Sequence, residues 1–251
     1  MPTCHKYLKP FYDTLVTIVL WIYFLLGAML IPVYLLIYLL SKDRVAAFQR
    51  LNHRFYKGLL WLMGAVIPGL TIDIDARVRG LGSCVVVSNH LSYLDPVILI
   101  SLFKKQCTIV KSGFFRFPVF GWIITAAGYI PSAGTGKLSL LLNRRIKHMN
   151  DYLYQGGVLF IFPEGTRSRD GRIGPFNKGA FKIARRCNAP IEIIRIANTD
   201  KLFTPGRLLF NTCVKNKIEV RWLGRISPDN NERIPIDELM SRTREIMEGN
   251  H

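Results

Sequence analysis

The sequence predicts an α/β fold: a single central domain built mostly around a β-sheet and flanked by helices, with an N-terminal apolar helical membrane anchor. Two patterns predict it. Residues 15–40 form one long apolar stretch, and from about residue 70 short apolar runs of strand length alternate with segments of helical period. The pattern changes at Pro68-Gly69, so we assign residues 1–68 to the membrane-anchoring helices and 69–251 to the α/β domain.

Composition points to an anionic partner. Lys and Arg total 34 against 17 Asp and Glu, which gives a net charge of +17, and 49% of the residues are hydrophobic. A basic chain with an apolar N-terminus favours a membrane lipid bilayer over nucleic acid, and the sequence has neither zinc-finger spacing nor an RNP-like aromatic signature. The cysteines are odd in number and lack a C-x-x-C motif, which predicts reduced thiols; they are Cys4, Cys84, Cys107, Cys187 and Cys213.

The apolar stretch 15–40 contains no charged side chain. As one helix it would extend about 39 Å, more than the ~30 Å hydrocarbon core of a bilayer. Pro32 removes a helical hydrogen bond, so we expect a kinked span or two shorter pieces that enter and leave one leaflet. More cationic residues follow the stretch than precede it, which predicts a location at the inner membrane with the main domain facing the cytoplasm. They are Lys6 and Lys9 before it, and Lys42, Arg44, Arg50, Arg54 and Lys57 after it.

An amphipathic helix is predicted next, over residues 45–67. It can pack on the domain or lie on anionic lipid, and the pattern alone leaves both open.

The α/β domain follows as alternating elements. We expect strands at 71–79 (an edge strand), 84–87, 107–110, within 126–132, at 158–162 and 191–196, a hairpin of 208–213 with 218–223, and helices from Pro96 to Leu102 and at 138–154, 176–187 and 235–247.

His90 and Asp95 are the first candidate site residues. His90 is released at the end of the strand 84–87, and Asp95 stands five residues later, before the helix. The carboxyl ends of strands in an α/β sheet often carry reactive side chains. A carboxylate there can orient an imidazole that takes a proton from a hydroxyl. On this stretch alone, Asp95 could equally be a helix cap.

A second candidate loop follows the strand 158–162. An anionic head group approaching it would meet Gly165, the hydroxyl of Thr166 and the forked guanidinium of Arg167. Glu164 could hold that guanidinium or accept a hydrogen bond from a substrate hydroxyl. A surface turn with an internal Glu-Arg pair is the alternative.

The aromatic stretch 111–122 has basic residues interleaved with its aromatic side chains. Such a mixture can stack on bases or form an apolar rim with cationic tips against lipid. With an apolar N-terminus in the same chain, we favour lipid.

Two motifs together resemble the glycerolipid acyltransferase family typified by 1-acyl-sn-glycerol-3-phosphate acyltransferase. They are N-H-L-S-Y-L-D at 89–95 and F-P-E-G-T-R-S at 162–168. Two further segments of the family match and occur in the same order. They are K-x-x-x-F-x-x-P-x-x-G, from Lys111 to Gly121, and a Val-Pro-Ile-like block, Ala189-Pro190-Ile191. The resemblance covers roughly residues 80–200.

This resemblance implies a reaction and roles for named residues. His90 would be the general base and Asp95 its partner, and the acceptor would be a lysophospholipid. The acyl donor would be acyl-CoA or acyl carrier protein, with no metal and no other cofactor. Arg167 and Lys111 would hold the acceptor's phosphate, and the pocket would be shaped by Glu164, Gly165 and Thr166.

One departure from the family pattern concerns the acceptor. Many phosphatidate-forming relatives carry a block that ends in Asp-Arg, where this chain has Gly128-Tyr129-Ile130-Pro131-Ser132. The first expectation is conversion of 1-acyl-sn-glycerol-3-phosphate to phosphatidate. Another hydroxylated lysolipid, such as lyso-ornithine lipid, stays open.

Two other functional classes stay open as well. One is a non-catalytic basic protein that binds membranes through residues 1–67. The other is a thioesterase or lipase that uses Ser88 or Ser92 with His90, although neither serine stands in a G-x-S-x-G elbow.

Overall fold

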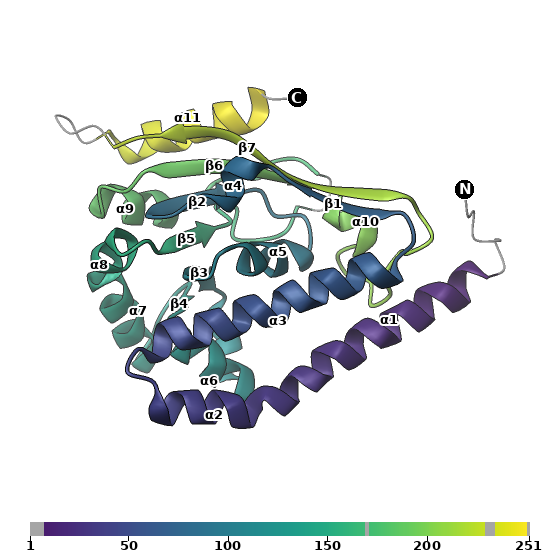
Figure 1. The fold of residues 1–251 in the computed structure, drawn as a ribbon. Coiled ribbons are helices and arrows are strands. Elements are labelled where there is room, and N and C mark those ends of the chain that lie inside the picture. Colours follow the sequence, from purple (N-terminus) through teal and green to yellow (C-terminus); the bar gives the residue numbers. More distant parts are fainter. Residues whose placement is uncertain (1–7, 169–170, 229–233, 250–251) are drawn as a thin grey trace.

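The computed structural model describes residues 8–168, 171–228 and 234–249, and a mixed β-sheet lies at its centre (Figure 1). This confirms the predicted α/β class, with helices on the faces of the sheet and an apolar helical segment at the N-terminus. The described strands are β1 (Leu70–Ile74), β2 (Cys84–Ser88), β3 (Gln106–Val110), β4 (Ile130–Pro131), β5 (Val158–Ile161), β6 (Ile191–Ala197) and β7 (Asn216–Ile226).

The strand order is β1-β7-β6-β2-β5-β3-β4. The strands β6, β2, β5, β3 and β4 run parallel to one another, whereas β7 pairs with β6 antiparallel and with β1 parallel. All five residues of β2 are buried, as expected for a central strand covered on both faces. The carboxyl ends of β2, β5, β3 and β6 therefore meet at one edge of the sheet, which is where α/β folds place their sites.

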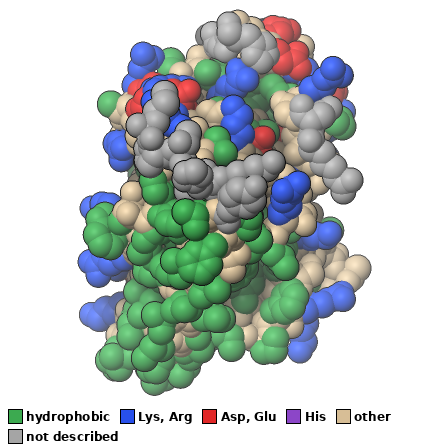
Figure 2. All heavy atoms as spheres, turned by 90° about the vertical axis from the view of Figure 1, so that its right-hand side faces the viewer, with side chains coloured by type: hydrophobic (Ala, Val, Ile, Leu, Met, Phe, Trp, Pro, Cys, Tyr) green, Lys and Arg blue, Asp and Glu red, His purple; other side chains and the backbone are tan. Residues whose placement is uncertain are grey.

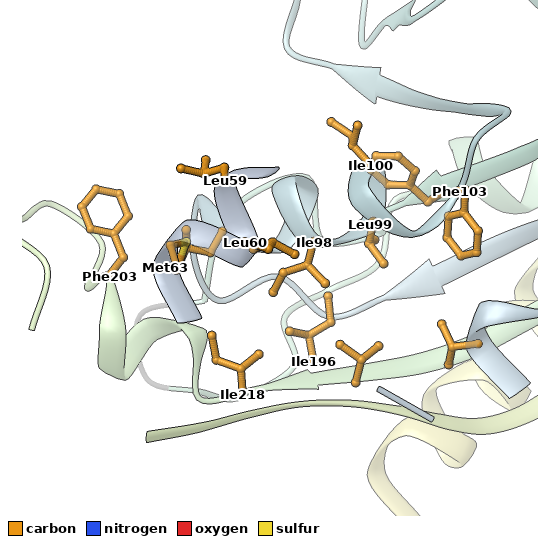
Figure 3. Packing of buried hydrophobic residues seen from close by; sticks show 14 of the residues in the cluster. Leu59, Leu60, Met63, Ile98, Leu99, Ile100, Phe103, Ile196, Phe203 and Ile218 are labelled. Carbon is orange, nitrogen blue, oxygen red and sulfur yellow. The ribbon is translucent and has the colours of Figure 1, made fainter. Parts of the chain in front are cut away.

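Helices cover both faces of the sheet. On one face Leu60 and Met63 of α3 pack with Ile98 of α5 against Ile196 and Ile218 of the sheet (Figure 3). The other face carries a second core to which α9 and α11 contribute. The helices of the domain are α3 (Arg44–Val66), α4 (Ala76–Arg79), α5 (Leu94–Leu102), η2 (Ser112–Arg116), α6 (Pro118–Ala126), α7 (Lys137–Lys147), α8 (Met149–Tyr154), α9 (Gly179–Arg186), α10 (Thr199–Leu202) and α11 (Ile236–Gly249).

The N-terminal segment is α1 (Lys9–Leu26), a short 3₁₀ turn η1 (Gly27–Leu30) and α2 (Ile31–Leu40). The break falls just before Pro32, which stands in the first turn of α2, where its missing N–H costs no hydrogen bond. By length and composition Lys9–Leu40 could cross a membrane, and only 17% of its most apolar window is buried in the protein. The long helix α3 separates this segment from the sheet (Figure 1).

Three sequence-based predictions of secondary structure are wrong. The edge strand ends at Ile74, because the Asp75 side chain accepts from the Arg77 N–H and caps the short helix α4. The helix predicted over 138–154 is two helices that meet at His148. The helix α5 begins at Leu94, so that Asp95 lies in its first turn.

The predicted hairpin is also wrong. Residues 208–213 form no strand, and β7 pairs with β6 and β1 instead. The backbone N–H groups of Phe210 and Thr212 donate to the side chains of Thr17 and Asp13 in α1, so they are not available to a second strand.

The prediction that all the cysteines are reduced thiols is wrong. Cys213 is disulfide-bonded. Cys84, Cys107 and Cys187 are free and buried, and Cys4 lies outside the described residues.

Candidate active site

His90 and Asp95 are in direct contact at the carboxyl end of β2. Nδ1 of His90 lies 2.8 Å from Oδ2 of Asp95. The Asp95 side chain is fully buried, whereas 16% of the His90 side chain is exposed. Because the carboxylate binds Nδ1–H, the lone pair of the neutral imidazole is on Nε2, where it can take a proton from a hydroxyl. An imidazole held in this way can act as a general base, with the carboxylate orienting it.

The Asp95 carboxylate is fully supplied with hydrogen-bond donors. Besides His90, Oδ2 accepts from the backbone N–H of Leu91 at 2.6 Å and of Ser92 at 2.8 Å. Oδ1 accepts from the hydroxyl of Thr199 at 2.6 Å. A buried carboxylate stays ionised only when such donors replace water. Asp95 therefore has two roles at once. It orders the turn by accepting from its backbone N–H groups, and it orients the imidazole of His90.

Asn89 fixes the turn to the neighbouring strand. Its side-chain amide donates to the carbonyl of Ile196 and accepts from the N–H of the same residue, both at 2.8 Å. This pair continues the hydrogen bonding between β2 and β6 by one step beyond the strand end. Sequence reasoning assigned no role to Asn89 or to Thr199, because their partners lie about 100 residues away along the chain.

The loop after β5 closes over the same turn. The ring of Phe162 stacks on His90 with a centroid separation of 4.1 Å, and the N–H of Ser168 donates to the His90 carbonyl at 2.8 Å. Glu164 is buried, and its two carboxylate oxygens accept from the N–H groups of His90 at 3.3 Å and Gly174 at 2.9 Å. Glu164 therefore ties the two motifs together through the main chain.

Gly165 has a left-handed backbone conformation, which favours glycine. Its φ is +68°, and a Cβ added there would lie 2.8 Å from the side-chain nitrogen of Asn177. The next residue, Thr166, is exposed at the same edge. The loop thus turns tightly and leaves Thr166 exposed, whereas Arg167 is only partly exposed.

Arg167 stacks on Tyr93, which comes from the turn between His90 and Asp95. The guanidinium carbon lies 3.7 Å from the centre of the tyrosine ring, and Nη2 donates to the Tyr93 hydroxyl at 3.1 Å. The described structure contains no Glu164–Arg167 ion pair. Nη1 is buried without a hydrogen-bond partner in the described structure. A guanidinium nitrogen without a partner can donate to a phosphate or carboxylate, and an anion would reach this one once the side chain shifts, because Nη1 is closed to solvent.

Lys111 stands apart from the other predicted residues. It follows β3, two strands from β2 in the sheet, and its side chain is exposed. No hydrogen bond or ion pair joins it to His90, Asp95 or Arg167 in the described part of the chain. Its role as a second phosphate-binding cation stays a prediction.

The serines beside His90 and the buried thiols of β2 and β3 are not activated nucleophiles. Ser88 and Ser92 are fully buried, and their hydroxyls donate to the carbonyls of Asn89 and Phe203. Burial raises the pKa of the Cys84 and Cys107 thiols to about 12. A thioesterase or lipase that works through a serine or cysteine nucleophile would need one of these groups to be accessible and activated by a base.

Comparison with known proteins points to one family. The family model described as Acyltransferase matches residues 70–197, which is just over half of the chain and includes both motifs.

Curated relatives carry one name. The chloroplastic 1-acyl-sn-glycerol-3-phosphate acyltransferase BAT2 of Brassica napus is 36% identical over 64% of this chain and 48% of its own length. The 1-acyl-sn-glycerol-3-phosphate acyltransferase of Saccharomyces cerevisiae is 29% identical over 71% of this chain and 60% of its own length. The chain thus spans about half the length of two chloroplastic relatives that it matches.

A solved structure has the same fold. The crystal structure of PlsC, the 1-acyl-sn-glycerophosphate acyltransferase of Thermotoga maritima, superposes with a TM-score of 0.70 at 20% identity. The match covers 95% of this chain and 94% of that one. It therefore extends over the N-terminal helices as well as the sheet.

Proposed function

This chain belongs to the acyltransferase family, as its resemblance to the glycerolipid acyltransferases implied, and we propose that it is a membrane-associated O-acyltransferase. It moves a fatty acyl group from acyl-CoA or acyl carrier protein to the hydroxyl of a lysophospholipid. The first candidate acceptor is 1-acyl-sn-glycerol-3-phosphate, which would give phosphatidate. The observation that carries the proposal is the 2.8 Å contact between His90 and a buried Asp95, beside an Arg167 with an unsatisfied nitrogen.

The proposed step is a direct transfer without an acyl-enzyme. Nε2 of His90 takes the proton of the acceptor hydroxyl as the oxygen attacks the thioester carbonyl. The new C–O bond forms through an oxyanion intermediate, the C–S bond then breaks, and the leaving thiolate takes up the proton that His90 holds. Asp95 stabilises the imidazolium that exists between these events. No serine or cysteine nucleophile is required, in keeping with the buried, hydrogen-bonded state of Ser88 and Ser92.

Binding of the acceptor's phosphate is assigned to Arg167. Its Nη1 supplies a donor, while Tyr93 holds the plane of the guanidinium. Gly165 permits close approach of the backbone, and Thr166 adds a hydroxyl at the exposed edge of the loop. Lys111, which follows β3, would be a second cation that contacts the bound phosphate.

Membrane association is assigned to α1 and α2. Many large apolar side chains on these helices and on the turn η1 between them are exposed, among them Phe11, Leu25, Met29, Leu39 and Leu40. The lower half of the face shown in Figure 2 is almost entirely hydrophobic, and Lys and Arg lie along its sides. So large an apolar surface is stable only against lipid or another apolar partner, and the basic flanks favour anionic lipid. The exposed rings of Phe114, Phe117 and Phe120 in η2 and α6 would add to this surface.

The experiment that tests the function is acyl transfer by the purified chain. The protein is incubated with an acyl-CoA and, separately, an acyl carrier protein donor, together with a panel of lysolipids that includes 1-acyl-sn-glycerol-3-phosphate and lyso-ornithine lipid. Free thiol and lipid products are measured by colorimetry and mass spectrometry.

Acceptor-dependent thiol release with a new diacyl lipid is the expected result. Thiol release without an acceptor would instead indicate a thioesterase. Absence of release with every acceptor and donor would leave a non-catalytic membrane-binding protein and overturn the proposal.

A further inference from the structure

A basic and apolar loop lies between α10 and β7. Within residues 203–214 the side chains of Leu208, Leu209 and Val214 are 77%, 48% and 44% exposed. Arg207 is exposed beside them, as are Lys201 and Lys215 at the two ends. The sequence has no acidic residue from 201 to 218. Exposed leucines flanked only by cations are typical of a segment that enters the interface of an anionic membrane.

The loop is bound to the start of α1. Thr212 donates twice to Oδ1 of Asp13, through its N–H at 2.8 Å and its hydroxyl at 2.6 Å. The N–H of Phe210 donates to the hydroxyl of Thr17 at 3.0 Å. Asp13 and Thr17 are buried polar residues one helical turn apart in a mostly apolar helix. These bonds hold the loop beside the first turns of α1, so the two segments approach a bilayer as one unit. Figure 1 shows the chain after α10 descending to α1.

The other end of the loop touches the candidate active site. The carbonyl of Phe203 accepts from the Ser92 hydroxyl at 2.7 Å, and its ring lies 6.3 Å from the ring of Tyr93. The ring of Phe210 stacks on Phe203 at 4.4 Å. The guanidinium of Arg167 in turn stacks on the ring of Tyr93. One continuous set of contacts therefore runs from the anchoring helix through the loop to the guanidinium.

From these contacts we infer that residues 203–214 are a second lipid-contacting element, separate from α1 and α2. Leu208, Leu209 and Val214 enter the apolar boundary of the leaflet, and Arg207 contacts anionic head groups. The loop holds the leaflet surface beside Arg167, so that an acceptor reaches the site from the lipid on this side. The inference rests on the membrane association proposed above and adds the element that meets the bilayer next to the phosphate-binding group.

Vesicle binding by the full chain tests this inference. Co-sedimentation is measured with vesicles of phosphatidylcholine, with and without phosphatidylglycerol, for the double variant Leu208→Asp/Leu209→Asp. The matched control is Leu140→Asp, a leucine that is 72% exposed on α7, outside the loop. We expect the double variant to bind anionic vesicles roughly tenfold more weakly, because two apolar side chains are replaced by anions, and the control to bind like wild type.

Two further variants separate this inference from the proposed function. Leu25→Asp/Leu39→Asp in α1 and α2 should abolish binding if those helices anchor the protein. Arg207→Gln should weaken binding only to vesicles that contain phosphatidylglycerol. Loss of binding in the α1–α2 variant, with wild-type binding in the loop variant, overturns the loop inference alone. No binding by wild type to either vesicle overturns the membrane association itself.

Acyl transfer gives an independent readout. With a short-chain, water-soluble lysophosphatidate the loop variant should keep a kcat/KM within about twofold of wild type, since the loop adds only lipid contact. When the acceptor is embedded in vesicles, the kcat/KM of the loop variant should fall in proportion to its loss of vesicle binding. Equal losses with both acceptors would show that the substitutions damage the site rather than its access to lipid, and would contradict the inference.

Discussion

The candidate site has two halves, one around His90 and Asp95 and one around Arg167. They differ in how many of their polar atoms have hydrogen-bond partners within the protein. The Asp95 carboxylate accepts hydrogen bonds from His90, Leu91, Ser92 and Thr199 and is closed to solvent. The anion-binding half, by contrast, has an unsatisfied nitrogen on Arg167.

The difference assigns the two halves to different tasks. A fully supplied carboxylate fixes the imidazole before any ligand arrives, so the proton-transfer half is preorganised. We propose that the acceptor's phosphate completes the hydrogen bonding of the Arg167 guanidinium, so that the second half depends on the acceptor. Variants in the first half should therefore lower kcat, and variants in the second half should raise the KM of the acceptor.

The largest effect is expected for His90→Ala. Removing the base should lower kcat by roughly 10²-fold or more, the usual contribution of general base catalysis, without loss of folding or vesicle binding. The measurement is acceptor-dependent thiol release. The control is His148→Ala, because His148 is exposed between α7 and α8. Turnover near the wild-type rate would remove His90 from the mechanism.

Arg167→Ala should chiefly affect the acceptor. Loss of a charge-assisted contact to phosphate should raise the acceptor KM by roughly 10- to 100-fold and leave the donor KM near its wild-type value. Arg167→Lys should restore only part of the affinity, because an ammonium group cannot reproduce the planar stack on Tyr93. Arg185→Ala, an exposed arginine at the end of α9, is the control. An unchanged acceptor KM would refute the phosphate-binding role.

Thr199→Val should act through Asp95. The buried Oδ1 would lose its hydroxyl donor, and we expect kcat to fall roughly tenfold with little change in either KM. Thr199→Ser should restore the rate, since it keeps the hydroxyl. Thr204→Val, at an exposed threonine nearby, is the control for the segment. A drop in melting temperature with unchanged kcat would make Thr199 structural only.

The smallest effect is expected at Tyr93. Tyr93→Ala should raise the acceptor KM by roughly three- to tenfold, because the cation–π contact that orients Arg167 is lost. Tyr93→Phe keeps the ring and should stay within about twofold of wild type. Equal effects of the two substitutions would show that the hydroxyl, rather than the ring, positions the guanidinium.

The sequence predicted the parts of the molecule whose partners are local. The strand that ends at His90, the loop after β5 and the apolar segment with its break before Pro32 follow from periodicity and from the conformational demands of Gly and Pro. The cap that ends the edge strand was available in the sequence as well, in Asp75, but alternation over 71–79 favoured a strand.

The remaining features depend on contacts between distant parts of the chain. Thr199 lies 104 residues from Asp95, and Thr212 lies 199 residues from Asp13. Residues 208–213 have a strand-like pattern, yet their donors are taken by a helix from the other end of the chain. No local pattern specifies such a partner. The pairing of Asn89 with Ile196 was missed for the same reason.

The central claim is that His90 and Asp95 act as one unit, and a double-mutant cycle tests it most directly. The kcat of acceptor-dependent thiol release is measured for wild type, His90→Ala, Asp95→Asn and the double variant. If the carboxylate acts only through the imidazole, Asp95→Asn should cost roughly 10²-fold alone and almost nothing once His90 is alanine. Losses that multiply in the double variant would mean that the two residues act independently, and the account of the site would be wrong.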